Sequence, residues 1–188
     1  MNRIVCFILA ALVFGIITLA QTRLTSLRGV DWTRENLTYL PSSDRIKPYL
    51  MGFESVYAEY LWIKTVLYFG SHSLTDKKYD YLITMIDNIT RINPYFYPAY
   101  EFAGLIIPDI CKNPSAAKII LERGLSHIGK TRWNLAFYMG VLYYKYYDDK
   151  VAAGLYYARA SQVPGAPVKK LSELAAGMMT KAGNKREA

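Results

Sequence analysis

Residues 100–124 read YEFAGLIIPDICKNPSAAKIILERG, and residues 136–160 read AFYMGVLYYKYYDDKVAAGLYYARA. The two stretches are in register at a spacing of 36 residues, with small and large residues recurring in matching places. The matched pairs are Gly104 with Gly140, Ala117 with Ala153, Leu121 with Tyr157 and Gly124 with Ala160. A fixed period of this size is typical of a repeat solenoid. Solenoids present extended binding surfaces and rarely carry chemistry, so the sequence predicts a binding function.

Helix-breaking residues divide the chain after residue 51 into helical segments. Proline pushes the preceding residue out of the helical region, and clusters of Pro, Gly, Asn and Asp mark turns. We expect turns at Ser73–Lys78, Asn93-Pro94, Pro108–Pro114, Gly129–Thr131, Asp148-Asp149 and Pro164–Pro167. These breaks predict six helices in three hairpins and a seventh helix over Val168–Thr180, after which the chain frays.

This hairpin pattern resembles the tetratricopeptide repeat family, whose unit has a small residue where its two helices cross and a small-x3-large pattern on the second helix. The unit that fits best has Ala136, Gly140 and Tyr143 on its first helix and Ala153, Tyr157 and Ala160 on its second. The chain departs from the family in its longer period and in Lys64, where an apolar residue is expected. The resemblance implies an all-α fold, with a right-handed solenoid of about three repeats and a C-terminal capping helix. It also implies that two backbones approach closely at Gly104 and Gly140.

Residues 4–20, IVCFILAALVFGIITLA, form an uncharged run that follows Arg3. The run is at the lower limit for crossing a bilayer, yet it is longer than the apolar core of most cleaved signal peptides. We expect an uncleaved transmembrane signal anchor that contacts membrane lipid, with cleavage after Ala20 as the alternative. Because a short N-terminal tail usually stays inside, this predicts a single-pass protein of the bacterial inner membrane with its repeat domain in the periplasm.

Four regions follow along the chain: the anchor over residues 1–22, a connector over 23–50, the helical repeat domain over 51–182 and a flexible tail over 183–188.

The formal charge is +8, and residues 111–188 hold thirteen Lys and Arg against five Asp and Glu. This basic half suits either an anionic surface or a solvated helix face. The 17 tyrosines fit either amphipathic helix packing or an aromatic binding groove.

In the tetratricopeptide family the inner face of the first helices usually lines the binding groove. Carried over residue by residue, the resemblance implies partner-binding roles for Glu59, Trp62, Phe69, Glu101, Leu105, Asp109, Asn134, Phe137, Tyr144 and Lys145. Aromatic side chains flanked by a few charges suit the capture of a peptide or a partner helix. The alternative is that Trp62 and Phe137 are ordinary packing residues between repeats.

The sequence contains no Ser-His-Asp arrangement, nucleotide-binding loop or carboxylate constellation, so we predict no catalytic residue, no cofactor and no metal site. A nucleic-acid partner is disfavoured by the expected location outside the cytoplasm.

The leading hypothesis is a membrane-anchored, non-enzymatic adaptor or scaffold that binds a protein partner in a membrane or envelope complex. The alternatives are a structural subunit permanently buried in a larger membrane assembly, and a module that binds a polysaccharide or an anionic polymer.

Overall fold

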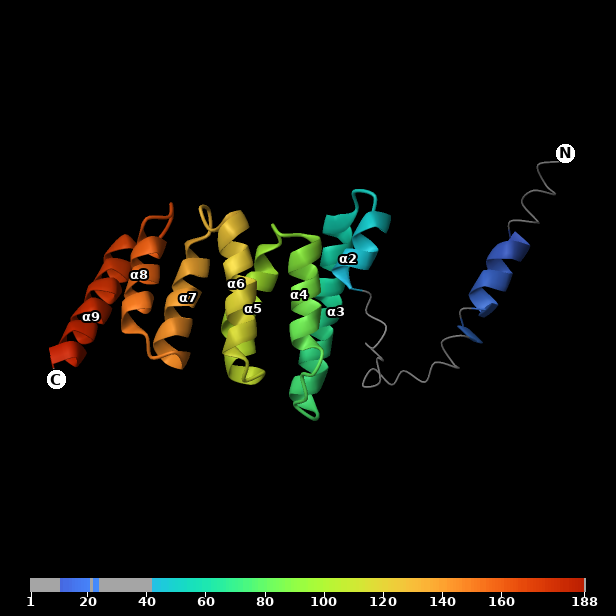
Figure 1. Cartoon of the computed structure of the whole chain (residues 1–188). Coiled ribbons are helices and arrows are strands. Elements are labelled where there is room, and N and C mark those ends of the chain that lie inside the picture. The colour runs from blue at the N-terminus through green and yellow to red at the C-terminus, as the bar shows by residue number, and fades with distance from the viewer. Residues whose placement is uncertain (1–10, 21, 24–41, 188) are drawn as a thin grey trace. The chain divides into compact units, whose positions relative to one another are not determined.

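The computed structural model describes residues 11–20, 22–23 and 42–187, and the regular secondary structure within these residues is all helical. The predicted all-α class is therefore confirmed. The chain divides into two compact units, Met1–Leu37 and Thr38–Ala188. The second unit contains α2 (Ser43–Ile46), the 3-10 helix η3 (Lys47–Tyr49), α3 (Glu54–Leu74), α4 (Leu82–Ile92), α5 (Tyr97–Ile110), α6 (Pro114–Ile128), α7 (Trp133–Tyr146), α8 (Lys150–Ser161) and α9 (Val168–Glu187) (Figure 1).

The first unit contains the C-terminal part of the expected anchor. Residues 11–20 are helical, and their large apolar side chains are exposed: Leu12, Val13, Phe14, Ile16, Ile17 and Leu19. Among the residues that the structure describes, no helix combines the length and the apolar character that crossing a bilayer requires. Residues 1–10 and 21 of the predicted anchor, residues 24–41 of the predicted connector and residue 188 of the predicted tail lie outside the described residues.

The second unit is a row of helical hairpins. α3 packs with α4, α5 with α6 and α7 with α8, and α9 then packs along α8, so that the helices follow one another in chain order (Figure 1). The period of the sequence is also the period of the structure, because α5 and α7 begin at Tyr97 and Trp133, 36 residues apart. α6 and α8 begin at Pro114 and Lys150, at the same spacing.

The turn inside each of these two hairpins repeats in atomic detail. Lys112 and Asp148 adopt positive φ angles of 53° and 48°, which reverse the chain after the first helix. The next residue then caps the second helix: Asn113 accepts a hydrogen bond from the backbone N–H of Ala116 at 3.0 Å, and Asp149 accepts one from Ala152 at 2.9 Å. Short polar side chains are the preferred caps because they satisfy donors that have no partner within the helix. The local sequence therefore fixes where each second helix begins.

The glycines of the repeat admit tyrosine rings, which corrects the expectation that two backbones meet at them. A Cβ on Gly140 would lie 2.5 Å from Cε1 of Tyr157, and one on Gly124 would lie 2.8 Å from Cδ1 of Tyr100. A Cβ on Gly104 would lie 3.0 Å from Cβ and Cγ of Tyr138. Tyr100 and Tyr157 are buried in the core. Part of the high tyrosine content is thus explained, because these rings fill the space that the glycines leave.

Three expected boundaries differ from the structure. Residues 43–49 of the predicted connector form α2 and η3, and the buried N–H of Ser43 donates to Oδ1 of Asn88 on α4 at 3.1 Å. Residues 183–187 of the predicted tail continue α9. Pro108 was expected in a turn but lies inside the last turn of α5, where its missing N–H removes one helical hydrogen bond.

Candidate functional site

A groove lies between the first helices of the second and third hairpins. Leu105 and Pro108 of α5 and Phe137 and Val141 of α7 supply its apolar walls, and its volume is about 170 Å³. Asp109 and Lys145 also line it, together with Gly104, Tyr138, Leu142 and Tyr146. We call this the α5–α7 groove. It brings together four of the predicted binding residues: Leu105, Asp109, Phe137 and Lys145.

A charged cluster lines part of the groove. The ammonium Nζ of Lys145 donates to both carboxylate oxygens of Asp109, at 2.7 and 2.9 Å, and the hydroxyl of Tyr146 donates to Oδ1 at 2.5 Å. These hydrogen bonds, first from Lys145 and then from Tyr146, lower the pKa of Asp109 from its usual range. The hydrogen bond to Asp109 likewise raises the pKa of Lys145. Both side chains are half exposed, so a ligand in the groove can reach them.

Glu101 joins the same two helices one turn of α5 before the groove. Its Oε1 accepts hydrogen bonds from the hydroxyl of Tyr97 at 3.0 Å and from the hydroxyl of Tyr138, across on α7, at 2.9 Å. Burial, and then the hydrogen bond to Glu101, raise the pKa of Tyr138 to about 12. The same two causes raise the pKa of Tyr97. Glu101 therefore links α5 to α7 beside the groove.

The Tyr138–Glu101 contact predicts a loss of stability at high pH. An ordinary tyrosine has a pKa of ~10, and burial together with the hydrogen bond to Glu101 raises the pKa of Tyr138 to about 12. Between these values the unfolded chain loses a proton that the folded chain keeps, so the contribution of Tyr138 to stability is full below the lower value and declines above it. We expect the unfolding midpoint, followed by circular dichroism, to fall less steeply over this range in Tyr138→Phe than in the wild type. Tyr144→Phe, which alters an exposed ring of the same helix, is the control. If the midpoint falls as steeply in Tyr138→Phe as in the wild type, Tyr138 is not the group whose ionisation destabilises the fold.

Three of the predicted aromatic residues make packing contacts with other rings. Trp62 and Phe69 of α3 meet the ring of Phe102 edge-on, at centroid distances of 5.5 and 5.2 Å, and so join the first hairpin to the second. Phe137 contacts the ring of Tyr157 at 5.7 Å while it also lines the groove. The structure thus gives Trp62 and Phe69 a packing contact and gives Phe137 both a packing contact and a place in the groove.

The remaining predicted residues lie apart from the groove lining. Glu59 on α3 and Tyr144 on α7 are exposed, and Asn134 at the start of α7 is half-buried. The sequence interpretation also missed Tyr138 and Tyr146, which bind Glu101 and Asp109. A signal for them was present, because each of these tyrosines follows its carboxylate by 37 residues, close to one period.

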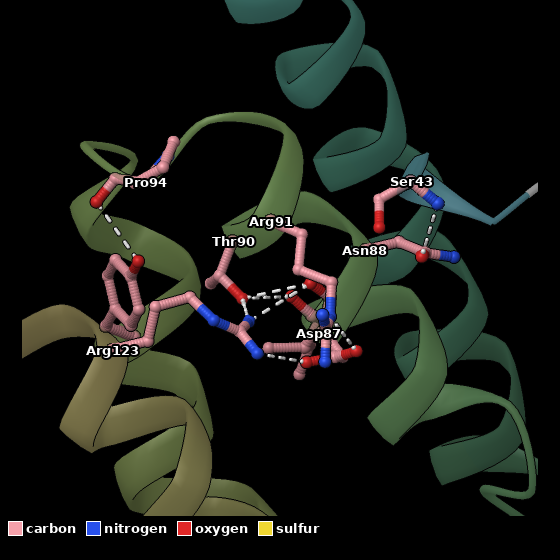
Figure 2. A network of polar contacts seen from close by, with 9 residues as sticks. Ser43, Asp87, Asn88, Thr90, Arg91, Pro94 and Arg123 are labelled. Atoms are coloured by element: carbon pink, nitrogen blue, oxygen red, sulfur yellow. Dashed lines mark hydrogen bonds and ion pairs between the residues drawn. The ribbon is translucent and has the colours of Figure 1, made fainter. Parts of the chain in front are cut away.

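A second polar network joins the second helices of neighbouring hairpins. Figure 2 shows Arg123 of α6 extended toward α4, where its Nη2 donates to Oδ1 of Asp87 at 2.7 Å and its Nη1 to the hydroxyl of Thr90 at 2.5 Å. Asp87 also accepts from Nε of Arg91 at 2.7 Å. Asp87 and Arg123 are 36 residues apart, as are Asp109 and Lys145. The polar contacts between hairpins therefore follow the repeat period.

Comparison with protein-family models, with curated proteins and with solved structures finds no match. The chemistry of the groove must therefore be inferred from its own residues. Within the described part of the chain, no group of three or more His, Cys, Asp or Glu side chains is placed to hold a metal ion. The groove offers an apolar surface beside one acidic and one basic group, an arrangement suited to the recognition of a peptide or a helix.

Proposed function

We propose that this chain is a membrane-anchored, non-catalytic adaptor of the tetratricopeptide type that binds a protein partner in a membrane or envelope complex. The observation that carries the proposal is the α5–α7 groove, in which predicted binding residues from two successive hairpins lie side by side. Successive first helices that together line one groove are typical of how a helical solenoid presents a binding surface.

The groove favours a partner segment with apolar anchor residues and a charged end. Leu105 is 53% exposed and offers an apolar contact at the edge of the groove. Asp109 and Lys145 form an exposed ion pair, and such pairs contribute at most ~1 kcal/mol. A partner can therefore exchange this internal pair for its own charged groups at little cost. Affinity should come mainly from apolar side chains buried against Leu105 and Phe137.

The anchor is supported by the composition of the N-terminal segment. Residues 4–20 are uncharged, and the described residues 11–20 are helical with exposed large apolar side chains. Exposed apolar patches of this kind mark surfaces that meet a membrane or another protein. We place the chain in the bacterial inner membrane as a single-pass protein, with the repeat domain in the periplasm. Anchoring would concentrate the groove at the bilayer surface, near membrane-bound partners.

Co-purification from gently solubilised membranes tests this function. We expect Leu105→Glu to abolish recovery of the protein that co-purifies with the wild-type chain, because an unpaired charge would then lie against the apolar walls of the groove. Ile119→Glu on α6 is the matched control, since Ile119 is apolar and 57% exposed but does not line the groove. Recovery that is equal in the two variants, or absent in the wild type, would contradict the proposal.

A second candidate function is that of a structural subunit permanently buried in a larger membrane assembly. The observation that favours it is the number of large apolar side chains exposed on α3, among them Val56, Ile63 and Leu67. A permanent subunit keeps its partner on dilution, whereas an adaptor with a short groove releases it. Dilution of the purified complex, followed by sedimentation, separates the two candidates.

A further inference from the structure

One face of α3 carries a row of large apolar side chains that are at least half exposed. Phe53, at the N-cap, is followed by Val56, Tyr60, Ile63, Leu67 and Leu74, and these side chains are between 50% and 89% exposed. Gly70 continues the row, and a Cβ there would meet nothing within 4 Å. We call this row the α3 stripe.

The spacing of the α3 stripe is that of a coiled-coil seam. From residue 53 the members follow one another at intervals of three and four residues without exception, which is the alternation of a and d positions in a heptad. The buried residues of the same helix, Ala58, Leu61, Thr65 and Tyr68, point the other way and pack toward α4. At 100° per residue the stripe and the buried face are nearly opposite. α3 is therefore apolar on two opposite sides, whereas a surface helix typically carries a single apolar stripe.

The exposed faces of α3 and α9, in the first hairpin and at the end of the array, differ in polarity. A solenoid normally covers its terminal hairpins with polar outer faces, because an apolar end would aggregate. α9, the last helix, comes closer to this expectation, because it exposes Lys169, Lys170, Ser172 and Glu173 among three exposed large apolar residues, Val168, Leu174 and Met179. The stripe leaves α3, in the first hairpin, without such a polar cover. The apolar outer face of α3 is therefore a surface on which another helix could pack.

We propose that the α3 stripe is the interface of a parallel homodimer, in which the α3 helices of two copies pack along each other as a short coiled coil. A seam of alternating a and d positions is self-complementary, as a two-fold interface must be. Val66 flanks the stripe and adds a seventh large apolar side chain. At about 100 Å² each, seven such side chains would bury roughly 700 Å² per copy, close to the ~800 Å² that a stable interface needs.

Charge sets the parallel orientation. Glu59 occupies the g position before Tyr60, and Lys64 occupies the e position after Ile63, five residues later. In a parallel pair the g position of one helix faces the following e position of the other, so Glu59 of each copy meets Lys64 of the second copy. An antiparallel pair sets g against g and e against e, and this attraction is then absent. Lys64 lies 5.4 Å from the ring of Tyr60 in one copy, which places its ammonium beside the stripe.

Cysteine cross-linking in membranes tests the pairing directly. In a chain carrying Cys6→Ser and Cys111→Ser, we expect Ile63→Cys to form a disulfide-linked dimer on mild oxidation, because residues of a parallel stripe lie opposite their own copies. Ile119→Cys, equally exposed on α6, is the control and should remain monomeric. No more cross-linking at position 63 than at position 119, or an adduct of another mass that shows a different protein on the stripe, would overturn the proposal.

Sedimentation of the full chain in mild detergent gives an independent measurement. We expect Leu67→Glu to halve the measured mass while the circular dichroism spectrum is unchanged, since Leu67 is exposed within one copy. Glu59→Lys should raise the dimer dissociation constant about 5-fold, and adding Lys64→Glu should restore it. A dimer that survives Leu67→Glu would overturn the proposal. Leu105→Glu should abolish partner binding in the groove and leave the dimer intact. The dimer can therefore be tested independently of the proposed function of the groove.

Discussion

Arg123→Ala is expected to lower the free energy of unfolding by about 3 kcal/mol. The side chain of Arg123 is 16% exposed, and its guanidinium binds the carboxylate of Asp87 and the hydroxyl of Thr90 on the neighbouring hairpin. Its removal leaves a half-buried carboxylate with one fewer donor, and the penalty for such a group exceeds the small net gain of an ordinary hydrogen bond. Guanidinium denaturation of the full chain, followed by circular dichroism, measures the effect.

The same substitution should also make unfolding less cooperative. In a repeat array each hairpin is stabilised by its neighbours, so a weaker contact between α4 and α6 uncouples the first hairpin from the rest. We therefore expect the slope of the unfolding transition to fall together with its midpoint.

Arg91→Ala is the matched control. Arg91 binds the same carboxylate at the same 2.7 Å, but it is 46% exposed and lies on the same helix as Asp87. Its loss should cost less than ~1 kcal/mol and leave the slope unchanged. Equal losses of unfolding free energy in Arg91→Ala and Arg123→Ala would contradict the prediction, because the contact between hairpins would then stabilise the protein no more than the contact within α4.

Gly140→Ala is expected to destabilise the protein by about 2 kcal/mol. The new methyl group would lie 2.5 Å from Cε1 and 2.6 Å from Cδ1 of Tyr157. That ring is held in a cluster with Ala153, Ala175 and Met178, so it cannot move aside without disturbing the packing of α8 on α9. The steric cost exceeds the ~1 kcal/mol that alanine gains over glycine in a helix.

Gly177→Ala on α9 separates the steric effect from helix propensity. A Cβ there meets nothing within 4 Å, so only the gain in propensity remains, and we expect a stabilisation of up to ~1 kcal/mol. Thermal unfolding of both variants gives the comparison. Tyr157→Leu should recover part of the loss in Gly140→Ala, and a Gly140→Ala variant as stable as the wild type would contradict the tight contact.

The sequence predicted the hairpin array because its signals are local. Asn113 before Pro114 and the Asp148-Asp149 pair mark turns by their own backbone preferences, and the structure caps helices at Asn113 and Asp149. The boundaries that differed depend on contacts between distant residues. The start of the folded unit at α2, for example, rests on a hydrogen bond from Ser43 to Asn88.

The groove was predicted only in part, for a related reason. The resemblance identified Asp109 and Lys145 separately, and it gave no reason to expect them to bind each other. Their spacing of one period, shared by Asp87 and Arg123, was available in the sequence as a signal of contact between hairpins. The tyrosine rings that lie against glycines could not be predicted, because helix propensity carries no information about which ring fills which space.

Photo-cross-linking in membranes tests most directly whether the α5–α7 groove binds a partner protein. A photoreactive benzoylphenylalanine is placed at position 105 in the full chain and, as the control, at position 119 on α6. If the groove binds a partner, we expect a light-dependent adduct of one discrete mass at position 105 that contains a different protein, and no adduct at position 119. No adduct at position 105, equal adducts at both positions, or an adduct that contains only two copies of this chain would contradict it.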